Sequence, residues 1–147
     1  VTEEPARYNL ASAQRASNLQ VIPGEETKGV IYFYNVDGNR ITYITLEVVQ
    51  APSNWEVEID PKNLQVEPTE LLSEPVRDVP QGMVCLVLSN RGYALAKVVT
   101  ITIRVPESEE VGTQRDVKIT AVASWLGQTG AITISQTRDF DFSVKVI

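Results

Sequence analysis

Apolar and polar residues alternate with a period of two along most of this chain. The alternation is clear in residues 99–105 and 116–125, and it is strictest in residues 139–146. In this last segment the apolar positions are Phe140, Phe142, Val144 and Val146. Strict alternation is typical of strands with one buried and one solvent-facing side, and it favours antiparallel over parallel sheets.

The same periodicity predicts strands along the rest of the chain. They cover residues 18–22, 28–35, 41–50, 55–59, 83–89 and 131–137, the last paired back on 116–125. No window of 12 or more residues shows a convincing helical period. Eight or nine short strands, separated by turns roughly ten residues apart, predict an all-β sandwich with residues 1–147 in a single domain.

Gln136 and Arg138 interrupt the apolar face of residues 131–146. Two polar residues at consecutive inward positions do not fit a continuous buried strand. A bulge, or a switch of the chain from one sheet to the other, is therefore predicted at this point.

Residues 61–82 break the rhythm most strongly. They contain four prolines, which exclude a central strand, so a long connection is predicted, with a single helical turn at 70–72 as one option. Between Glu56 and Asp78 there are seven acidic residues against two basic ones, so this part of the chain is also acidic.

The composition removes several classes of chemistry. The chain has 13 Lys and Arg residues against 19 Asp and Glu residues, and this net charge of −6 argues against nucleic-acid binding. It has no histidine, which excludes Ser-His-Asp and Cys-His nucleophile pairs and histidine metal sites. Its single cysteine, Cys85, lies in the apolar run 83–88 and is predicted to be a buried small hydrophobe. That run is the longest apolar stretch, far short of the roughly 18 residues that span a bilayer.

We predict no catalytic residue, no metal site and no cofactor. Paired carboxylates can hydrolyse glycosides, but no spacing among the 19 acidic residues singles out such a pair. The loop 35–39 is predicted to be a tight turn, because Leu46 occupies the position where a calcium loop needs an acid. The acidic loop 107–110 is predicted to be solvated surface. Trp55 and Trp125 fall in phase with the apolar positions of their strands and are predicted to lie in the core.

Several short motifs occur in one order along the chain. They are VIPGE at 21–25, YNVDG at 34–38, APSNW at 51–55, ITIRVPE at 101–107, VGT at 111–113 and VKITA at 117–121. In this order they resemble the Ig-like, fibronectin-like β-sandwich family associated with bacterial alpha-galactosidases (NPCBM-associated) and with archaeal surface proteins. The resemblance spans residues 18–123 and implies an Ig-like antiparallel sandwich that serves as a non-catalytic, extracytoplasmic accessory module. It carries over no catalytic residue, and residues 65–95 are longer than the connection usual in the family.

Three tyrosines are the main candidates for a binding surface. If the apolar residues of 28–35 face the core, Tyr32 and Tyr34 point outward. A hairpin with residues 41–50 would place Tyr43 opposite Tyr32 and form an exposed aromatic patch. The resemblance instead implies an arch between opposite sheets, which would put Tyr43 elsewhere, and we favour the arch.

Glu67, Glu70 and Glu74 of the acidic connection complete the candidate interaction surface. The leading hypothesis is a non-catalytic structural and interaction module of a prokaryotic, and we expect archaeal, cell-surface or secreted protein. Its loops would contact a protein or an envelope component. The alternative is a carbohydrate-binding accessory domain that uses exposed tyrosines, with a polysaccharide as its partner. A third hypothesis is a homo-oligomer formed through an edge strand such as 139–147.

The expected location is extracellular or in the cell envelope. Because the chain begins at Val1 and not with Met, we expect it to have been processed or cut from something longer. A membrane anchor can therefore lie outside this chain.

Overall fold

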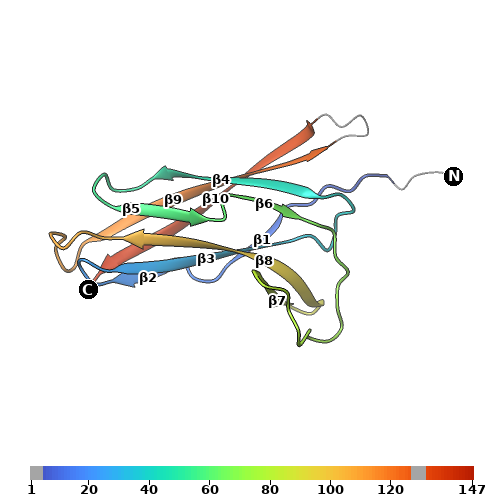
Figure 1. The fold of residues 1–147 in the computed structure, drawn as a ribbon, viewed down its shortest axis with the longest axis horizontal. Coiled ribbons are helices and arrows are strands. Elements are labelled where there is room, and N and C mark those ends of the chain that lie inside the picture. Colours follow the sequence, from blue (N-terminus) through green and yellow to red (C-terminus); the bar gives the residue numbers. More distant parts are fainter. Residues whose placement is uncertain (1–4, 127–131) are drawn as a thin grey trace.

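The protein is built from β-strands in the part of the chain that the computed structural model describes, residues 5–126 and 132–147. The strands form two sheets that pack face to face (Figure 1). They are β1 (Ala11–Gln14), β2 (Asn18–Val21), β3 (Glu26–Tyr34), β4 (Thr42–Gln50), β5 (Glu56–Asp60), β6 (Asn63–Val66), β7 (Met83–Leu88), β8 (Gly92–Arg104), β9 (Gln114–Leu126) and β10 (Ile132–Val146). The predicted all-β sandwich is confirmed, with ten strands where eight or nine were expected. The described residues contain no helix that could cross a bilayer.

The strand order is that of an immunoglobulin-like sandwich. Sheet A has the order β1-β3-β8-β5, with β7 paired to the first half of β8, and sheet B has the order β2-β10-β9-β4-β6. These orders match the ABED and GFC sheets of the constant-type immunoglobulin fold, to which β2 and β6 add the two edges of sheet B. The described pairs are antiparallel except for β2 with β10, which is parallel. The start of the chain is thus divided between the sheets, β1 in sheet A and β2 in sheet B.

The connection from β3 to β4 is an arch, because these two strands belong to opposite sheets. Asn35, whose side chain is fully buried, organises this arch. Its Nδ2 donates to the carbonyls of Arg40 at 2.8 Å and Val66 at 3.3 Å, and its Oδ1 accepts from the Gly38 N–H at 3.1 Å. The arch that the resemblance implied is therefore confirmed, and one buried amide links it to the end of β6.

The core lies between the inward faces of the two sheets. Phe142 and Trp125 are fully buried and Trp55 is 6% exposed, which confirms the prediction for both tryptophans. The Trp125 Nε1 donates to the Thr42 Oγ1 at 2.8 Å, and that hydroxyl donates to the Asn9 carbonyl at 3.0 Å. The largest core side chain is therefore fixed by packing and by a hydrogen bond, as buried polar atoms require.

The segment 61–82, predicted as a connection, contains an additional strand. β6 forms one edge of sheet B, so the connection proper covers residues 67–82. The helical turn predicted within it is absent, because Leu72 forms a β-bridge with Tyr93 through two hydrogen bonds of 2.8 Å. Gly92 makes room for this bridge, since a Cβ at that position would collide with the carbonyl oxygen of Leu72.

β10 runs unbroken through sheet B, so the predicted switch between sheets at Gln136 and Arg138 does not occur. A register shift lies nearer the start of the strand, between Ile132 and Ile134. The two polar residues belong to a stretch, 135–139, in which every residue is exposed, so they need no apolar partner. The turn predicted to precede this strand lies outside the described residues.

An ion pair fastens the arch to the tip of the β7–β8 hairpin. Two guanidinium nitrogens of Arg91 lie 2.6 and 3.1 Å from the two carboxylate oxygens of Asp37. Hydrogen bonds from Arg91 lower the pKa of Asp37, burial opposes this, and the charge of Arg91 adds to it. Both side chains are about half exposed, so solvent screens the pair.

Replacing Arg91 with alanine is expected to raise the pKa of Asp37 toward its ordinary value. Because the folded-state pKa is lowered, the pair stabilises the fold above the unfolded pKa of about 3.9 and ceases to do so as the pH falls through the folded value. An NMR titration of the Asp37 carboxyl carbon measures the change. Arg104→Ala is the control, since Arg104 contacts other carboxylates. An Asp37 pKa that is equal in wild type and Arg91→Ala would contradict this account.

Candidate functional site

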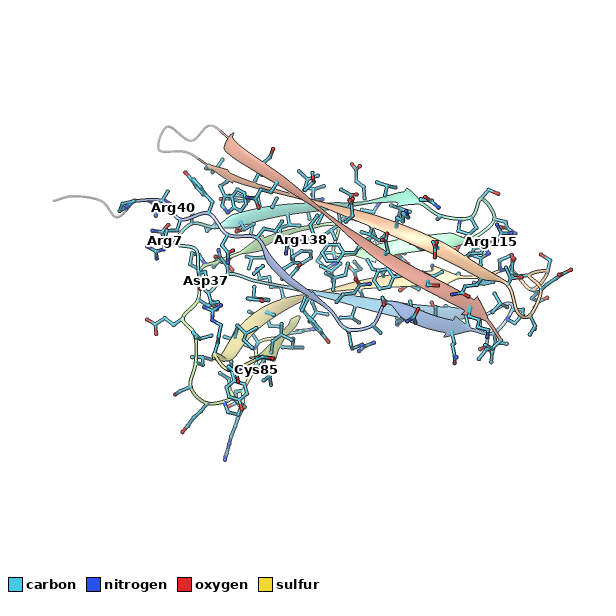
Figure 2. The ribbon with its side chains drawn as sticks, turned by 180° about the vertical axis from the view of Figure 1, so that it is seen from behind. Arg7, Asp37, Arg40, Cys85, Arg115 and Arg138 are labelled. Carbon is cyan, nitrogen blue, oxygen red and sulfur yellow. The ribbon has the colours of Figure 1, made fainter. Side chains whose placement is uncertain are left out.

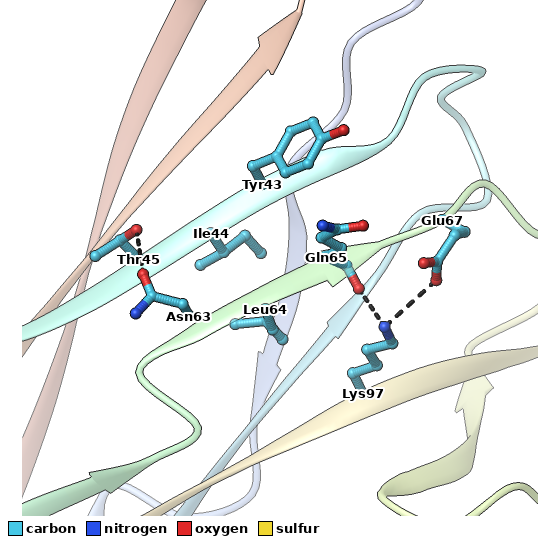
Figure 3. Close-up of a pocket in the computed structure, with 8 residues that line it drawn as sticks. All are labelled: Tyr43, Ile44, Thr45, Asn63, Leu64, Gln65, Glu67 and Lys97. Carbon is cyan, nitrogen blue, oxygen red and sulfur yellow. Dashed lines mark hydrogen bonds and ion pairs between the residues drawn. The ribbon is translucent and has the colours of Figure 1, made fainter.

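A hollow of about 540 Å³ opens where β6, at the edge of sheet B, faces β8 of sheet A (Figure 3). Its polar lining comes from three strands and the residue that follows β6. These lining residues are Tyr43 and Thr45 of β4, Asn63 and Gln65 of β6, Glu67, and Lys97 of β8. Ile44 and Leu64 supply apolar lining.

Cross-strand pairing brings the polar side chains of β4 and β6 together. Tyr43 is paired with Gln65, and Thr45 with Asn63, in the antiparallel ladder of these strands. Because Ile44 between them is buried, Tyr43 and Thr45 point to the outer face of sheet B. The Thr45 Oγ1 donates to the Asn63 Oδ1 at 2.8 Å, which fixes the orientation of the amide.

The side chain of Lys97 extends from sheet A to the edge of sheet B. It stands on the inward side of β8, in phase with the buried Val99 and opposite the core residue Phe33 of β3. Its Nζ donates to the backbone carbonyl of Gln65 and lies 3.4 Å from a carboxylate oxygen of Glu67 (Figure 3). This ammonium occupies a backbone acceptor on the outer edge of β6, a common way of protecting an exposed strand edge.

Two further hollows continue the first one along β4. One of about 260 Å³ shares Tyr43 and is also lined by Arg40 and Leu126. Another of about 360 Å³ shares Thr45 and Asn63. A strand advances about 3.3 Å per residue, so the three hollows follow one another along roughly 20 Å. We call this line the β4 groove, with Tyr43, Thr45, Asn63, Gln65, Glu67 and Lys97 at its centre.

The centre of the β4 groove is a neutral binding surface, and the outer hollows add the charged side chains of Arg40, Glu47 and Lys62. The charges of Lys97 and Glu67 balance each other, and the other central residues are uncharged. Asn35 and Thr42 are the buried polar side chains of the described residues, so no ionisable side chain among these residues is buried. No group of three potential metal ligands occurs within the same residues. Amides, hydroxyls and one aromatic ring can bind an extended ligand that is rich in hydrogen-bonding groups.

Of the predicted site residues, Tyr43 and Glu67 line the same hollow. The other four lie outside it. Tyr32 and Tyr34 lie half-buried in sheet A, whereas Tyr43 lies in sheet B. The three-tyrosine patch that a hairpin would have formed is therefore absent.

Glu70 and Glu74 are exposed on the connection 67–82 and lie outside the lining of the β4 groove. Cys85 is half-buried and not fully buried as predicted, because β7 is an edge strand. Of the three acidic candidates, Glu67 alone lines the β4 groove, where it lies beside Lys97.

Sequence reasoning missed four central residues of the groove, Thr45, Asn63, Gln65 and Lys97. Asn63 and Gln65 were missed because the prolines around them led to the prediction of a connection and not of a strand. The signal for Lys97 is its position, since it is a charged residue in phase with the apolar positions Val99 and Ile101.

Comparisons with known proteins give no family for this chain: no protein-family model and no curated protein matches it. Among solved structures, it is similar to the E. coli chaperone DraB, with a TM-score of 0.40 and 9% identity over 93% of this chain. It is also similar to BcpA, the major pilin subunit of Bacillus cereus, with a TM-score of 0.40 and 8% identity over 94% of this chain. The chain spans 55% of the DraB chain and 40% of the BcpA chain. A TM-score of 0.40 lies below the level at which two chains share one fold, so neither protein informs the function of this one.

Proposed function

We propose that this domain is a non-catalytic structural and interaction module of a prokaryotic cell-surface or secreted protein. In this proposal the β4 groove contacts a protein or an envelope component. The order of the sequence motifs, which resembles that of archaeal surface domains, supports the setting. The rigid sandwich supports the role, because the backbone of paired strands is already ordered before a ligand binds, which lowers the entropic cost of binding.

The observation that carries the proposal is the placement of the ionisable side chains. None of those in the described residues is buried. General acid–base catalysis depends on carboxylates or amines whose pKa values are shifted by burial and by close charges inside a cleft. The polar groups of the β4 groove are arranged differently, as surface donors and acceptors around a tyrosine ring.

A polysaccharide is the second candidate for the ligand, and the position of Tyr43 favours it. The residue lines two adjoining hollows, and its partner across the ladder is Gln65. An aromatic ring beside side-chain amides suits a sugar, which offers an apolar ring face and many hydroxyls. The elongated groove suits a chain of several sugar units.

The test offers the immobilised domain two probes, a purified cell-wall polysaccharide and a purified surface-layer protein. We expect saturable binding to one probe, with no release of reducing sugar and no cleavage of the protein. Tyr43→Ala should weaken this binding about tenfold or more, since central aromatic residues carry much of the energy of an interface. Biolayer interferometry measures the affinity.

Tyr32→Ala is the matched control, because Tyr32 is a half-buried tyrosine in the opposite sheet. We expect its affinity to stay within about twofold of wild type. Binding of the polysaccharide would select the second candidate. Turnover of either probe, retention of neither, or equal losses in the two variants would overturn the proposal.

A further inference from the structure

β7 (Met83–Leu88) is an edge of sheet A that is paired on one side alone. The Val98 N–H donates to the Gly82 carbonyl at 3.1 Å, which sets the phase of the β7–β8 ladder. In an antiparallel ladder, alternate residues direct their backbone groups to opposite sides of the strand. Cys85 and Val87 therefore direct their N–H and C=O groups outward, where no described backbone group bonds to them.

This edge is apolar along its whole length. The six residues of β7 are Met83, Val84, Cys85, Leu86, Val87 and Leu88. Val87 is 73% exposed, the highest exposure among the large hydrophobic side chains of the described residues. Figure 2 places Cys85 on the hairpin at one end of the molecule, away from the main body of the sandwich. Exposed apolar strand edges are templates for pairing with another strand.

The other strand edges carry features that oppose such pairing. β5 has three acidic residues in five positions, and the edge of β6 is occupied by Lys97. β1 and β2 have four residues each. The open part of β10, residues 135–139, includes Arg138 and Asp139. Charges, a bound lysine and short length are the usual protections of strand edges, and β7 has none of them.

The edge that the sequence suggested for self-association, residues 139–147, is largely taken. β2 pairs with residues 143–146 of β10 in parallel. The carbonyl of Asp141, just before them, accepts from the Gln14 side chain at 2.8 Å. The start of the chain therefore covers much of this edge, and self-association through it stays a prediction.

We propose that two copies of this chain pair through β7, antiparallel, about a two-fold axis at Cys85. This register aligns residues 83–87 with the same residues of the second copy, so apolar side chains meet on both faces. Val87 of each copy then lies opposite Met83 of the other, which covers the exposed valine. A second copy fits better than a different strand because β7 is complementary to itself in this register and brings no like charges together. The two A sheets become one continuous sheet.

The register makes a geometric prediction that the native thiol can report. Directly opposite residues that exchange both backbone hydrogen bonds have Cα atoms about 5.5 Å apart. A disulfide needs a Cα separation of about 4.4–6.8 Å. The Cβ atoms of such a hydrogen-bonded pair are about 5.5 Å apart, and a disulfide needs about 3.5–4.5 Å, so the two Cys85 thiols can bridge at the axis after a shift of about 1 Å. The backbone and apolar contacts hold the pair, so the disulfide is a reporter and not a requirement.

The first experiment is sedimentation velocity of Cys85→Ser from micromolar to millimolar concentration. We expect a concentration-dependent dimer, which Val87→Lys in the same background should weaken at least tenfold by placing two ammonium groups in the seam. Val111→Lys is the matched control, since Val111 is 70% exposed in a loop after β8, and it should dimerise as the parent does. Thermal unfolding checks that both variants remain folded.

The second experiment treats the wild-type chain with oxidised glutathione, which takes two electrons and two protons from two Cys85 thiols and leaves two reduced glutathione molecules. A covalent dimer, suppressed by Val87→Lys and retained in Val111→Lys, is expected. A monomer at every concentration, or a dimer that Val87→Lys leaves intact, would overturn the pairing through β7. A cross-link that forms as readily in Val87→Lys as in the wild type would overturn the register centred on Cys85. These readouts do not involve the β4 groove, so this inference and the proposed function can fail separately.

Discussion

Trp125→Ala is expected to lower the free energy of unfolding by about 3–5 kcal/mol, the range for removing a large aromatic side chain from a core. Trp125 is fully buried, and its ring packs 5.6 Å from that of Tyr8. Its removal leaves a cavity between the sheets, and Thr42 loses the donor to its hydroxyl. Urea unfolding followed by circular dichroism measures the change.

Trp125→Phe separates packing from hydrogen bonding. Phenylalanine retains most of the apolar volume but cannot donate to Thr42, so we expect a smaller loss of about 1–3 kcal/mol. If the two substitutions lower the free energy of unfolding equally, the lost hydrogen bond to Thr42, and not the lost packing, accounts for the effect of Trp125→Ala. A loss below about 1 kcal/mol for Trp125→Ala would show that the region around β9 can collapse onto the space.

Gly29→Ala is expected to destabilise the domain by about 1–3 kcal/mol, although alanine suits a strand better than glycine does. Gly29 is a buried residue of β3, and a Cβ at this position would collide with the ring of Phe142. Phe142 is itself fully buried, so its ring has no open space into which it can move. The midpoint of urea unfolding should fall with little change in its slope.

A double-mutant cycle with Phe142→Leu tests that cause. The smaller side chain should remove most of the clash, so the cost of Gly29→Ala should be much smaller in the Phe142→Leu background. Val30→Ala is a control in the neighbouring position of β3, since its effect should be similar in both backgrounds. Strict additivity of Gly29→Ala and Phe142→Leu would refute the clash.

Much of the sandwich could be predicted from sequence because alternation reports burial directly. The limit is clear from one tetrapeptide, Asn-Leu-Gln-Val, which occurs at 18–21 and again at 63–66. Both copies form short strands with the same burial pattern, and they are the two edges of sheet B. The first copy was predicted as a strand, but Pro61 and Pro68 around the second indicated a connection. Prolines flanking a strand exclude a central position and not an edge.

The candidate site was less predictable because it depends on contacts between the sheets. Lys97 is separated from Gln65 by 32 residues, and no local pattern relates the two. The arch likewise separates Tyr43 from Tyr32 and Tyr34, since it places β3 and β4 in different sheets. Periodicity places a side chain on a face of its own strand, but the topology decides which faces meet.

The placement of β1 in sheet A and of β2 in sheet B has a mechanical consequence. β2 and β10 run parallel over four paired positions, with bonds at both ends from Ser143 to Ser17 at 2.7 Å and from Ile147 to Val21 at 2.9 Å. Tension applied between the start and the end of the chain pulls these two strands along each other in opposite directions. The bonds of the pair are then loaded together and not one after another. The domain is therefore expected to resist stretching where β2 pairs with β10.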